Sequence, residues 1–164
     1  MKLLIAKDIT GIDVTEDYLN DFLDKISSSF QSHIVLFDGS LKEQYEDFQF
    51  PDSVQYVKVA YEDRGTINLM GLNAAAVNGC AACLFFPQNS YPKTGIVEKL
   101  FSEMADENIS ATFCDYTEND ILMVQNTPVV ICRRVEENNG DMFNLQACKG
   151  IVKYIPMDLY NVSG

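Results

Sequence analysis

The sequence predicts a single α/β domain in which a mainly parallel sheet is flanked by helices. Two observations lead to this prediction. Short apolar runs alternate along the chain with segments whose apolar residues have helical spacing, and such alternation is typical of a parallel sheet. The length of 164 residues, with 47% hydrophobic and 22% charged residues, suits one folded domain with a buried core.

The first part of the chain contains three predicted strands and a helix. Residues 2–6 and 33–37 are short apolar runs typical of buried strands, and residues 54–60 alternate like a third strand. Thr15 is a predicted helix N-cap, because a hydroxyl there can accept a hydrogen bond from the first turn. The buried face of the helix that follows is predicted at Leu19, Phe22, Leu23, Ile26 and Phe30.

The central part of the chain predicts a helix that leads into a deeply buried strand. Residues 66–77 are rich in Ala, Leu and Met, and Gly79 stands where a helix C-cap favours a left-handed residue. Residues 80–86 are continuously apolar, and Pro87 ends this predicted strand because it cannot donate to a ladder. Ligands of open α/β sheets bind outside the carboxyl ends of the strands, so residues 87–90 are expected beside any site.

The last part of the chain predicts two helices among shorter strands. Pro92 occupies a position that proline favours, the start of a helix, and this helix is predicted to continue through Met104. A short helix is predicted from Asp141, as its cap, to Cys148. The remaining predicted elements are a strand at 109–116, a hairpin of 121–124 with 128–132, and an extended segment at 151–160.

Composition excludes several classes of partner. The formal net charge of −12 argues against nucleic acid or an anionic membrane, since both need a basic surface. No apolar run is long enough for a membrane span. Five cysteines, an odd number among apolar neighbours, predict reduced thiols and a cytoplasmic protein. Cys80 and Cys83 have redox or zinc spacing, but inside a strand residues three apart face opposite ways, so a structural role is expected.

Several short motifs, taken in order, resemble those of family 2 glycosyltransferases. Residues 37–40 read Phe-Asp-Gly-Ser, where that family has Asp-Asp-Gly-Ser after its second strand. Arg64-Gly65 and the Asn/Ala-rich segment from Leu72 to Gly79 are similar to a loop and helix that come next in the family. Residues 92–100 resemble its Pro-x-x-Leu helix, and the tail from 140 to 160 resembles its last conserved segments.

The resemblance spans nearly the whole chain and implies a fold and a chemistry. It implies a single-domain GT-A-like three-layer α/β/α structure over residues 1–164, which binds a nucleotide-diphosphate sugar and a hydroxyl acceptor. The family's buried strand ends in Asp-x-Asp, which holds a divalent cation on the diphosphate. Here residues 86–89 read Phe-Pro-Gln-Asn and offer no carboxylate, so this motif is degenerate. We therefore expect no cofactor, and binding of Mn or Mg as in the family is not expected.

Asp38 and Arg64 have proposed roles in such a site, each with a structural alternative. Asp38 could accept a hydrogen bond from the base or ribose, or form an Asx turn with the following glycine. Arg64 could pair with a phosphate, or form a surface ion pair with Glu62 or Asp63. Asp8 occupies the place where the family's first strand ends in its own binding motif.

The remaining candidate residues lie after the central strand and near the end of the chain. Asp141 could be the general base that deprotonates the acceptor hydroxyl, and it could also cap the predicted short helix. Gln88 and Asn89 could contact the sugar or diphosphate as neutral donors, or they could simply end the strand.

Two functions from different classes remain open from the sequence. One is an inverting glycosyltransferase in which Asp141 acts as the base. The other is a catalytically degenerate GT-A domain that serves as a binding or interaction module. The degenerate motif and the net charge favour the second function, whereas Asp38, Arg64 and Asp141 favour the first.

Overall fold

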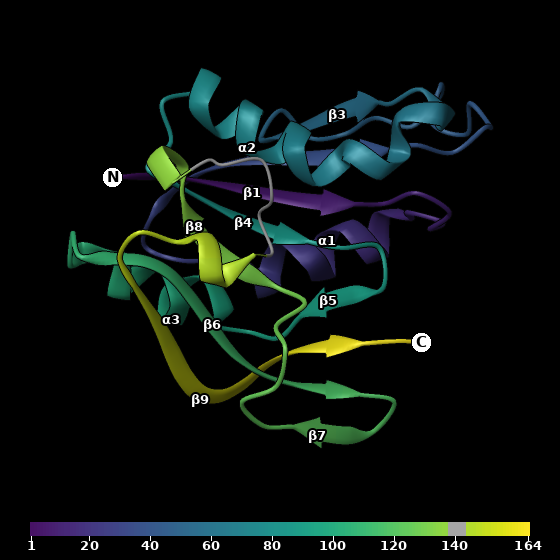
Figure 1. Ribbon diagram of the computed structural model, residues 1–164. Coiled ribbons are helices and arrows are strands. Elements are labelled where there is room, and N and C mark those ends of the chain that lie inside the picture. The colour runs from purple at the N-terminus through teal and green to yellow at the C-terminus, as the bar shows by residue number, and fades with distance from the viewer. Residues whose placement is uncertain (138–143) are drawn as a thin grey trace.

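Nine strands form one sheet with helices on both of its faces in the computed structural model, which describes residues 1–137 and 144–164 (Figure 1). The strands are β1 (Lys2–Asp8), β2 (Gln31–Asp38), β3 (Val54–Lys58), β4 (Ala82–Phe86), β5 (Ser90–Pro92), β6 (Ile109–Glu118), β7 (Ile121–Met123), β8 (Ile131–Arg134) and β9 (Ile151–Val162). The helices are α1 (Glu16–Lys25), α2 (Ile67–Val77) and α3 (Ile96–Ser102). Four 3₁₀ turns are η1 (Tyr61–Thr66), η2 (Glu103–Ala105), η3 (Val135–Glu137) and η4 (Leu145–Ala147).

The sheet has a parallel half and a mixed half. Its strand order is β3-β2-β1-β4-β8-β6-β9-β5, with β7 paired to β6 outside this path. β1 pairs in parallel with both β2 and β4, and β2 pairs in parallel with β3. β8 is antiparallel to both β4 and β6, and β9 is parallel to β6. The predicted α/β class, a sheet flanked by helices, is thus confirmed, and the parallel pairs are concentrated among β1, β2, β3 and β4.

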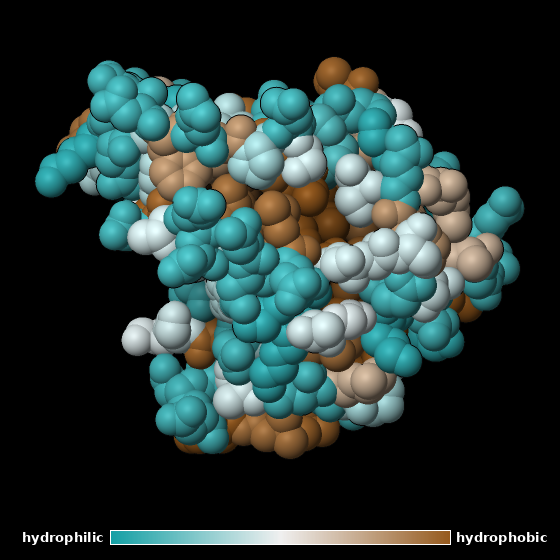
Figure 2. Space-filling model, turned by 180° about the vertical axis from the view of Figure 1, so that it is seen from behind, coloured by the Kyte–Doolittle hydropathy of each residue, from teal (hydrophilic) through white to brown (hydrophobic). Residues whose placement is uncertain are grey.

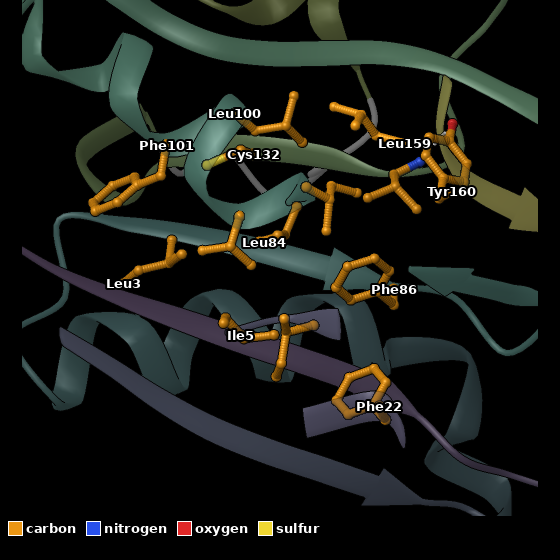
Figure 3. Packing of buried hydrophobic residues seen from close by; sticks show 14 of the residues in the cluster. Leu3, Ile5, Phe22, Leu84, Phe86, Leu100, Phe101, Cys132, Leu159 and Tyr160 are labelled. Carbon is orange, nitrogen blue, oxygen red and sulfur yellow. Dashed lines mark hydrogen bonds between the residues drawn. The ribbon is translucent and has the colours of Figure 1, made fainter. Parts of the chain in front are cut away.

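Alternation along the central strands divides the core between the two faces of the sheet. Leu3 and Ile5 of β1 belong to the larger cluster, which includes apolar residues of α1 and α3, whereas Leu4 and Ala6 belong to the smaller one beneath α2. Figure 3 shows Phe22 of α1 and Phe86 of β4 facing each other across the larger cluster, where their ring centroids lie 6.0 Å apart. The central strands are therefore buried on both faces, as their continuous apolar sequences predict.

The start of α1 confirms one local prediction, and its end corrects another. Thr15 accepts a hydrogen bond through its Oγ1 from the Tyr18 amide, at 3.1 Å, and so caps the helix as predicted. The helix ends at Lys25, however, and does not continue to Phe30. Phe30 precedes β2 and packs edge-on against Phe101 of α3, at 4.7 Å between centroids. Its apolar character reflects burial between elements, which helical spacing alone could not distinguish.

The predicted hairpin of residues 121–124 with 128–132 is wrong. β7 pairs with β6 across a tight turn at Asn119 and Asp120, both of which have positive φ. β8 lies in the middle of the sheet, between β4 and β6. Asn and Asp tolerate the left-handed region, and this property makes residues 119–120 the hairpin turn.

Two helix predictions near proline and glycine residues are also corrected. Pro92 ends β5, and α3 begins only at Ile96, after Gly95 with its φ of 91°. The short helix predicted from Asp141 to Cys148 is represented in the described residues by one 3₁₀ turn, η4, while Asp141 itself lies outside them. β4 begins at Ala82, so Cys80 precedes the strand, and Cys80 and Cys83 belong to the same apolar cluster instead of facing opposite ways.

Candidate functional site

The candidate site is the sheet edge at which β1, β2 and β4 end. Because these strands are parallel, their carboxyl ends meet there, and Asp8 pairs with Phe37 while Lys7 pairs with Phe86. β1 has β2 on one side and β4 on the other, so the chain connections diverge at β1. Ligands of open α/β sheets bind at such a switch point. The loops after the three strands, residues 9–14, 39–41 and 87–89, are therefore the candidate binding elements.

Asp38 is a fully buried carboxylate at this edge. Its Oδ1 accepts hydrogen bonds from the Ser40 amide at 2.9 Å and the Ser40 hydroxyl at 2.5 Å, and its Oδ2 accepts one from the Tyr56 hydroxyl at 2.6 Å. Burial raises the pKa of Asp38, but these hydrogen bonds and the ammonium of Lys58, 3.8 Å away, together lower it below its ordinary value. Asp38 thus forms the Asx turn and stays ionised inside the protein.

Thr10 joins the three loops. Its hydroxyl accepts a hydrogen bond from the Gly39 amide at 2.8 Å, and its carbonyl accepts one from the side-chain amide of Gln88. Its own amide donates to Asp8 Oδ1 at 2.9 Å. The loops after β1, β2 and β4 therefore form one hydrogen-bonded unit.

Gly11 allows the loops after β1 and β4 to approach this closely. Its φ of 75° lies in the left-handed region, and a Cβ atom built there would lie 3.1 Å from Gln88 Nε2. Its amide also donates to Ser40 Oγ at 3.2 Å. Glycine is thus required at this position for both its backbone conformation and the contact.

Lys7 is the residue of this edge that the sequence analysis did not identify. Its side chain is only 1% exposed, and its Nζ donates to the carbonyls of Pro87 at 2.9 Å and Gln88 at 3.0 Å. Desolvation lowers the pKa of Lys7 to about 7, although the nearby charge of Asp8 acts to raise it. The sequence signal was a lysine that directly follows an apolar run, one residue before the end of β1.

Arg64 lies in η1, beside the loop that follows β2. A Cβ atom on Gly39 would lie 2.8 Å from the Arg64 Cβ, so η1 packs directly against this loop. The guanidinium is exposed, donates to the Tyr61 carbonyl at 2.7 Å, and stacks 3.7 Å from the centroid of the Tyr61 ring. It forms no ion pair with Glu62 or Asp63, which were the alternative partners. Stacking leaves its remaining donors at the surface of the edge.

Of the two amides after β4, Gln88 is already bonded within the protein. Its side chain reaches the Thr10 carbonyl, so its donor role is structural in this conformation. The exposed side chain of Asn89 makes no hydrogen bond with the described residues, while its carbonyl accepts from the Ser163 amide at 2.9 Å. Asn89 is thus the amide that remains available for a ligand. Asp141 lies outside the described residues, so its role as a base remains a prediction.

Two hollows lie away from this edge. One of about 270 Å³ is lined by Ile5, Leu23, Ile26 and Phe30 at the start of the central strands. The other, of about 650 Å³, lies between α1 and residues 47–51. Figure 2 views the molecule from the side of α1 and α3 and shows apolar atoms at the floor of a hollow on that face. The candidate site is defined by its loops, and neither hollow includes them.

Side chains that could bind a metal are dispersed in the described part of the chain. Within residues 1–137 and 144–164, no three His, Cys, Asp or Glu side chains form a group that could hold a metal ion. Cys80 and Cys83 are reduced and buried, and desolvation raises the pKa of both thiols. Among these described residues there is also no helix with the length and apolarity that a bilayer crossing needs.

Comparison with known proteins finds solved structures with a similar fold. No protein-family model matches the sequence, and neither does any curated protein. The crystal structure of S. aureus TarS 1–349 is similar over 99% of this chain and 60% of that chain, with a TM-score of 0.67 and 12% identity. The same protein in complex with UDP-GlcNAc is similar over 100% of this chain and 59% of that chain, with a TM-score of 0.62 and 12% identity.

A second similar structure is 4-diphosphocytidyl-2C-methyl-D-erythritolsynthase from Anaerococcus prevotii DSM 20548. It is similar over 94% of this chain and 86% of that chain, with a TM-score of 0.60 and 12% identity. This chain spans about 60% of the length of TarS 1–349. At such identities the likeness establishes a glycosyltransferase-like fold of the nucleotide-diphospho-sugar transferase type and nothing finer.

Proposed function

We propose that this protein binds a nucleotide-diphosphate sugar at the edge formed by β1, β2 and β4, and that it transfers the sugar with inversion to a hydroxyl acceptor. The observation that carries the proposal is the hydrogen-bonded unit of three loops at the switch point, with ionised Asp38 inside it. The likeness to TarS, which was crystallised with UDP-GlcNAc, supports the choice of ligand class.

We assign ligand contacts to the exposed side chains and positioning roles to the side chains that are bonded within the protein. Arg64 and Asn89 carry exposed donors for the diphosphate and sugar. Asp38, already bonded to Ser40 and Tyr56, holds the loop beside the base and ribose, and Asp8 fixes the start of the first loop through Thr10. By its resemblance to the family, Asp141 is the general base for the acceptor hydroxyl.

A degenerate binding module is the second candidate function, and one observation favours it. The loop after β4 presents a neutral sequence, Gln88 donates to Thr10, and two carbonyls of the loop face Lys7. A diphosphate must therefore be held by protein donors, because the loop contributes no carboxylate for a divalent cation. Such a site would bind the nucleotide weakly and would not depend on manganese.

Calorimetric titration with UDP and other nucleoside diphosphates, first in chelator and then in manganese, tests binding. We expect similar weak affinities in both conditions, and a melting temperature that rises with ligand concentration. Mass spectrometry of mixtures with UDP-sugars and hydroxyl acceptors then separates the two functions. Transfer that Asp141→Asn abolishes without loss of binding supports the enzyme, and binding without turnover supports the module. Absence of any nucleotide binding would contradict both.

A further inference from the structure

Lys7 is a buried basic residue at the end of the central strand, and its amino group has no carboxylate partner among the described residues. Among the described residues no Asp or Glu oxygen lies within 4.0 Å of its Nζ. Strand alternation places its side chain on the same face as Ile5, and its neighbours in register are Leu36 of β2 and Phe86 of β4. An ammonium in such surroundings is costly, because its hydrogen bonds and the nearby charge of Asp8 offset its desolvation only in part.

Both hydrogen bonds that the Lys7 side chain makes with described residues go to the turn that follows β4. Its Nζ donates to the carbonyls of Pro87 and Gln88. The Pro87 carbonyl also accepts from the Ser90 amide at 3.0 Å and the Ser90 hydroxyl at 2.8 Å. The turn 87–90 is therefore closed around the Lys7 amino group. Gln88, held by this turn, donates to Thr10 and so connects the same amino group to the loop after β1.

The surroundings leave the charge of Lys7 sensitive to a bound anion. Asp8 on its own strand is the charged group that acts on it, and the turn itself consists of Pro, Gln, Asn and Ser. From α1, Phe22 packs near Phe86, and Tyr18 stays neutral near pH 7 because burial raises its pKa to about 12. With its own pKa lowered to about 7, Lys7 is partly neutral at neutral pH.

We propose that Lys7 is a positioning residue for the diphosphate, which sets the shape of turn 87–90 and supplies a buried positive charge beneath it when an anion binds. The inference rests on the proposed function, since it concerns the same site. A diphosphate bound beyond the carboxyl ends of β1 and β4 favours the charged form of Lys7. On binding, the complex therefore takes up as much as one proton from the buffer to form that ammonium. The affinity for a nucleoside diphosphate then falls as the pH rises above 7.

A structural role for Lys7 makes a different prediction. If the side chain only held the turn, a neutral amine would still donate two hydrogen bonds, and binding would not be coupled to its protonation. The pH dependence of binding therefore separates the two roles. Lys7→Met keeps the length and apolar stem of the side chain but removes the charge and the donors. Lys7→Arg keeps a charge at every pH in this range.

The experiment is calorimetric titration with UDP between pH 6 and 9, in pairs of buffers that differ in ionisation enthalpy. For the wild type we expect proton uptake on binding. Its affinity should fall as the pH rises above 7, by up to about tenfold per pH unit. Lys7→Met should bind more weakly at pH 6 and lose both the proton uptake and the steep pH dependence. Lys7→Arg should restore affinity at pH 9. Lys153→Met is the matched control, because it removes a cation that pairs with Glu103 away from the site.

The outcomes distinguish the inference from the proposed function. Binding of UDP by the wild type with no proton uptake, or a Lys7→Met profile equal to that of the wild type, overturns the role of Lys7 and leaves the proposed function standing. Absence of UDP binding by the folded wild type overturns both. If Lys7→Arg does not fold, the comparison of Lys7→Met with Lys153→Met still decides.

Discussion

Asp38 shows how a single ionised side chain is held inside this fold. Its two oxygens are bonded to Ser40 and Tyr56, and these donors compensate for its loss of water. Replacement of one donor leaves the carboxylate buried but less well satisfied, and its pKa should then rise. The stability of ionised Asp38 therefore depends on the hydroxyl of Tyr56, which comes from the neighbouring edge strand β3.

Tyr56→Phe should lower the free energy of unfolding at pH 7 by about 1.5–3 kcal/mol, the usual contribution of a hydrogen bond to a charged group. The lowered pKa of Asp38 contributes stability above the unfolded pKa of about 3.9, and that stability is lost as the pH falls through the folded value. The variant should therefore lose less stability on acidification than the wild type. Urea unfolding at pH 7 and pH 3 measures both effects. Tyr61→Phe, at an exposed tyrosine, is the control, and an equal loss in both variants would contradict the prediction.

Lys7 should make the protein more stable as the pH rises above neutrality. The folded pKa, about 7, lies below the ordinary lysine pKa of 10.5, so the unfolded chain binds more protons between these two values. Stability therefore increases with pH across this window, and the charge of Lys7 costs stability at and below pH 7. Relative to Lys7→Met, the wild type should gain a few kcal/mol between pH 6.5 and pH 9.5, at about 1.36 kcal/mol per pKa unit. Parallel stability curves for the two proteins would rule this out.

The sequence identified Asp38 but not Lys7, and the reason is physical. An Asp-Gly-Ser segment after an apolar run has few uses other than a turn or a site, so its position was informative. Lysine is almost never fully buried without a partner, so its type gave no sign that Lys7 is buried. Its partners are the carbonyls of Pro87 and Gln88, which are distant in sequence, and no local pattern indicates such a contact.

The packing of α2 against the sheet depends on one small residue. A Cβ atom on Gly71 would lie 3.3 Å from the Phe85 ring and 3.5 Å from the Ala6 Cβ, so the helix lies close to β1 and β4. The helix brings η1, and with it Arg64, toward the edge of the sheet. Contacts at this interface are therefore connected to the site through the position of η1.

Gly71→Leu should destabilise the protein by about 1–3 kcal/mol despite the better helix propensity of leucine, because the interface has no room for the side chain. Asn73→Leu, at an exposed position of the same helix, provides the matched control and should change stability little. Chemical denaturation of both variants measures the difference. Equal stabilities would mean that the interface can adjust to the larger residue.

At the level of secondary-structure elements, the sequence predicted the location of the strands better than their pairing. Continuous apolar runs located β1, β2 and β4, because burial on both faces removes every polar position from a strand. The pairing of β7 was predicted wrongly because Gln125, Asn126 and Thr127 also resemble a turn, although the tighter turn lies at Asn119 and Asp120. The placement of β8 between β4 and β6 depends on contacts across the whole sheet, which spacing along the chain does not encode.

The net charge of −12 acts on the whole molecule and opposes the approach of a diphosphate. The exposed guanidinium of Arg64 is a local exception at the site edge. In the proposed function, Arg64→Ala should weaken UDP binding about tenfold, the value expected for the loss of one charge-assisted hydrogen bond. Titrations at low salt and at 0.15 M, where the Debye length is about 8 Å, should show a smaller loss at the higher salt. Unchanged affinity in Arg64→Ala would remove Arg64 from the site.

The position of β8 has a consequence for how the chain folds. β3, β2, β1 and β4 come from residues 2–86, but β4 is covered on its other side only when Ile131 to Arg134 arrive. Until then β4 is an open edge whose residues are all apolar, and such edges pair readily with other chains. We therefore expect the yield of refolding to fall as protein concentration rises, with losses to aggregation that begin before β8 docks. Light scattering during refolding at several concentrations would measure this competition.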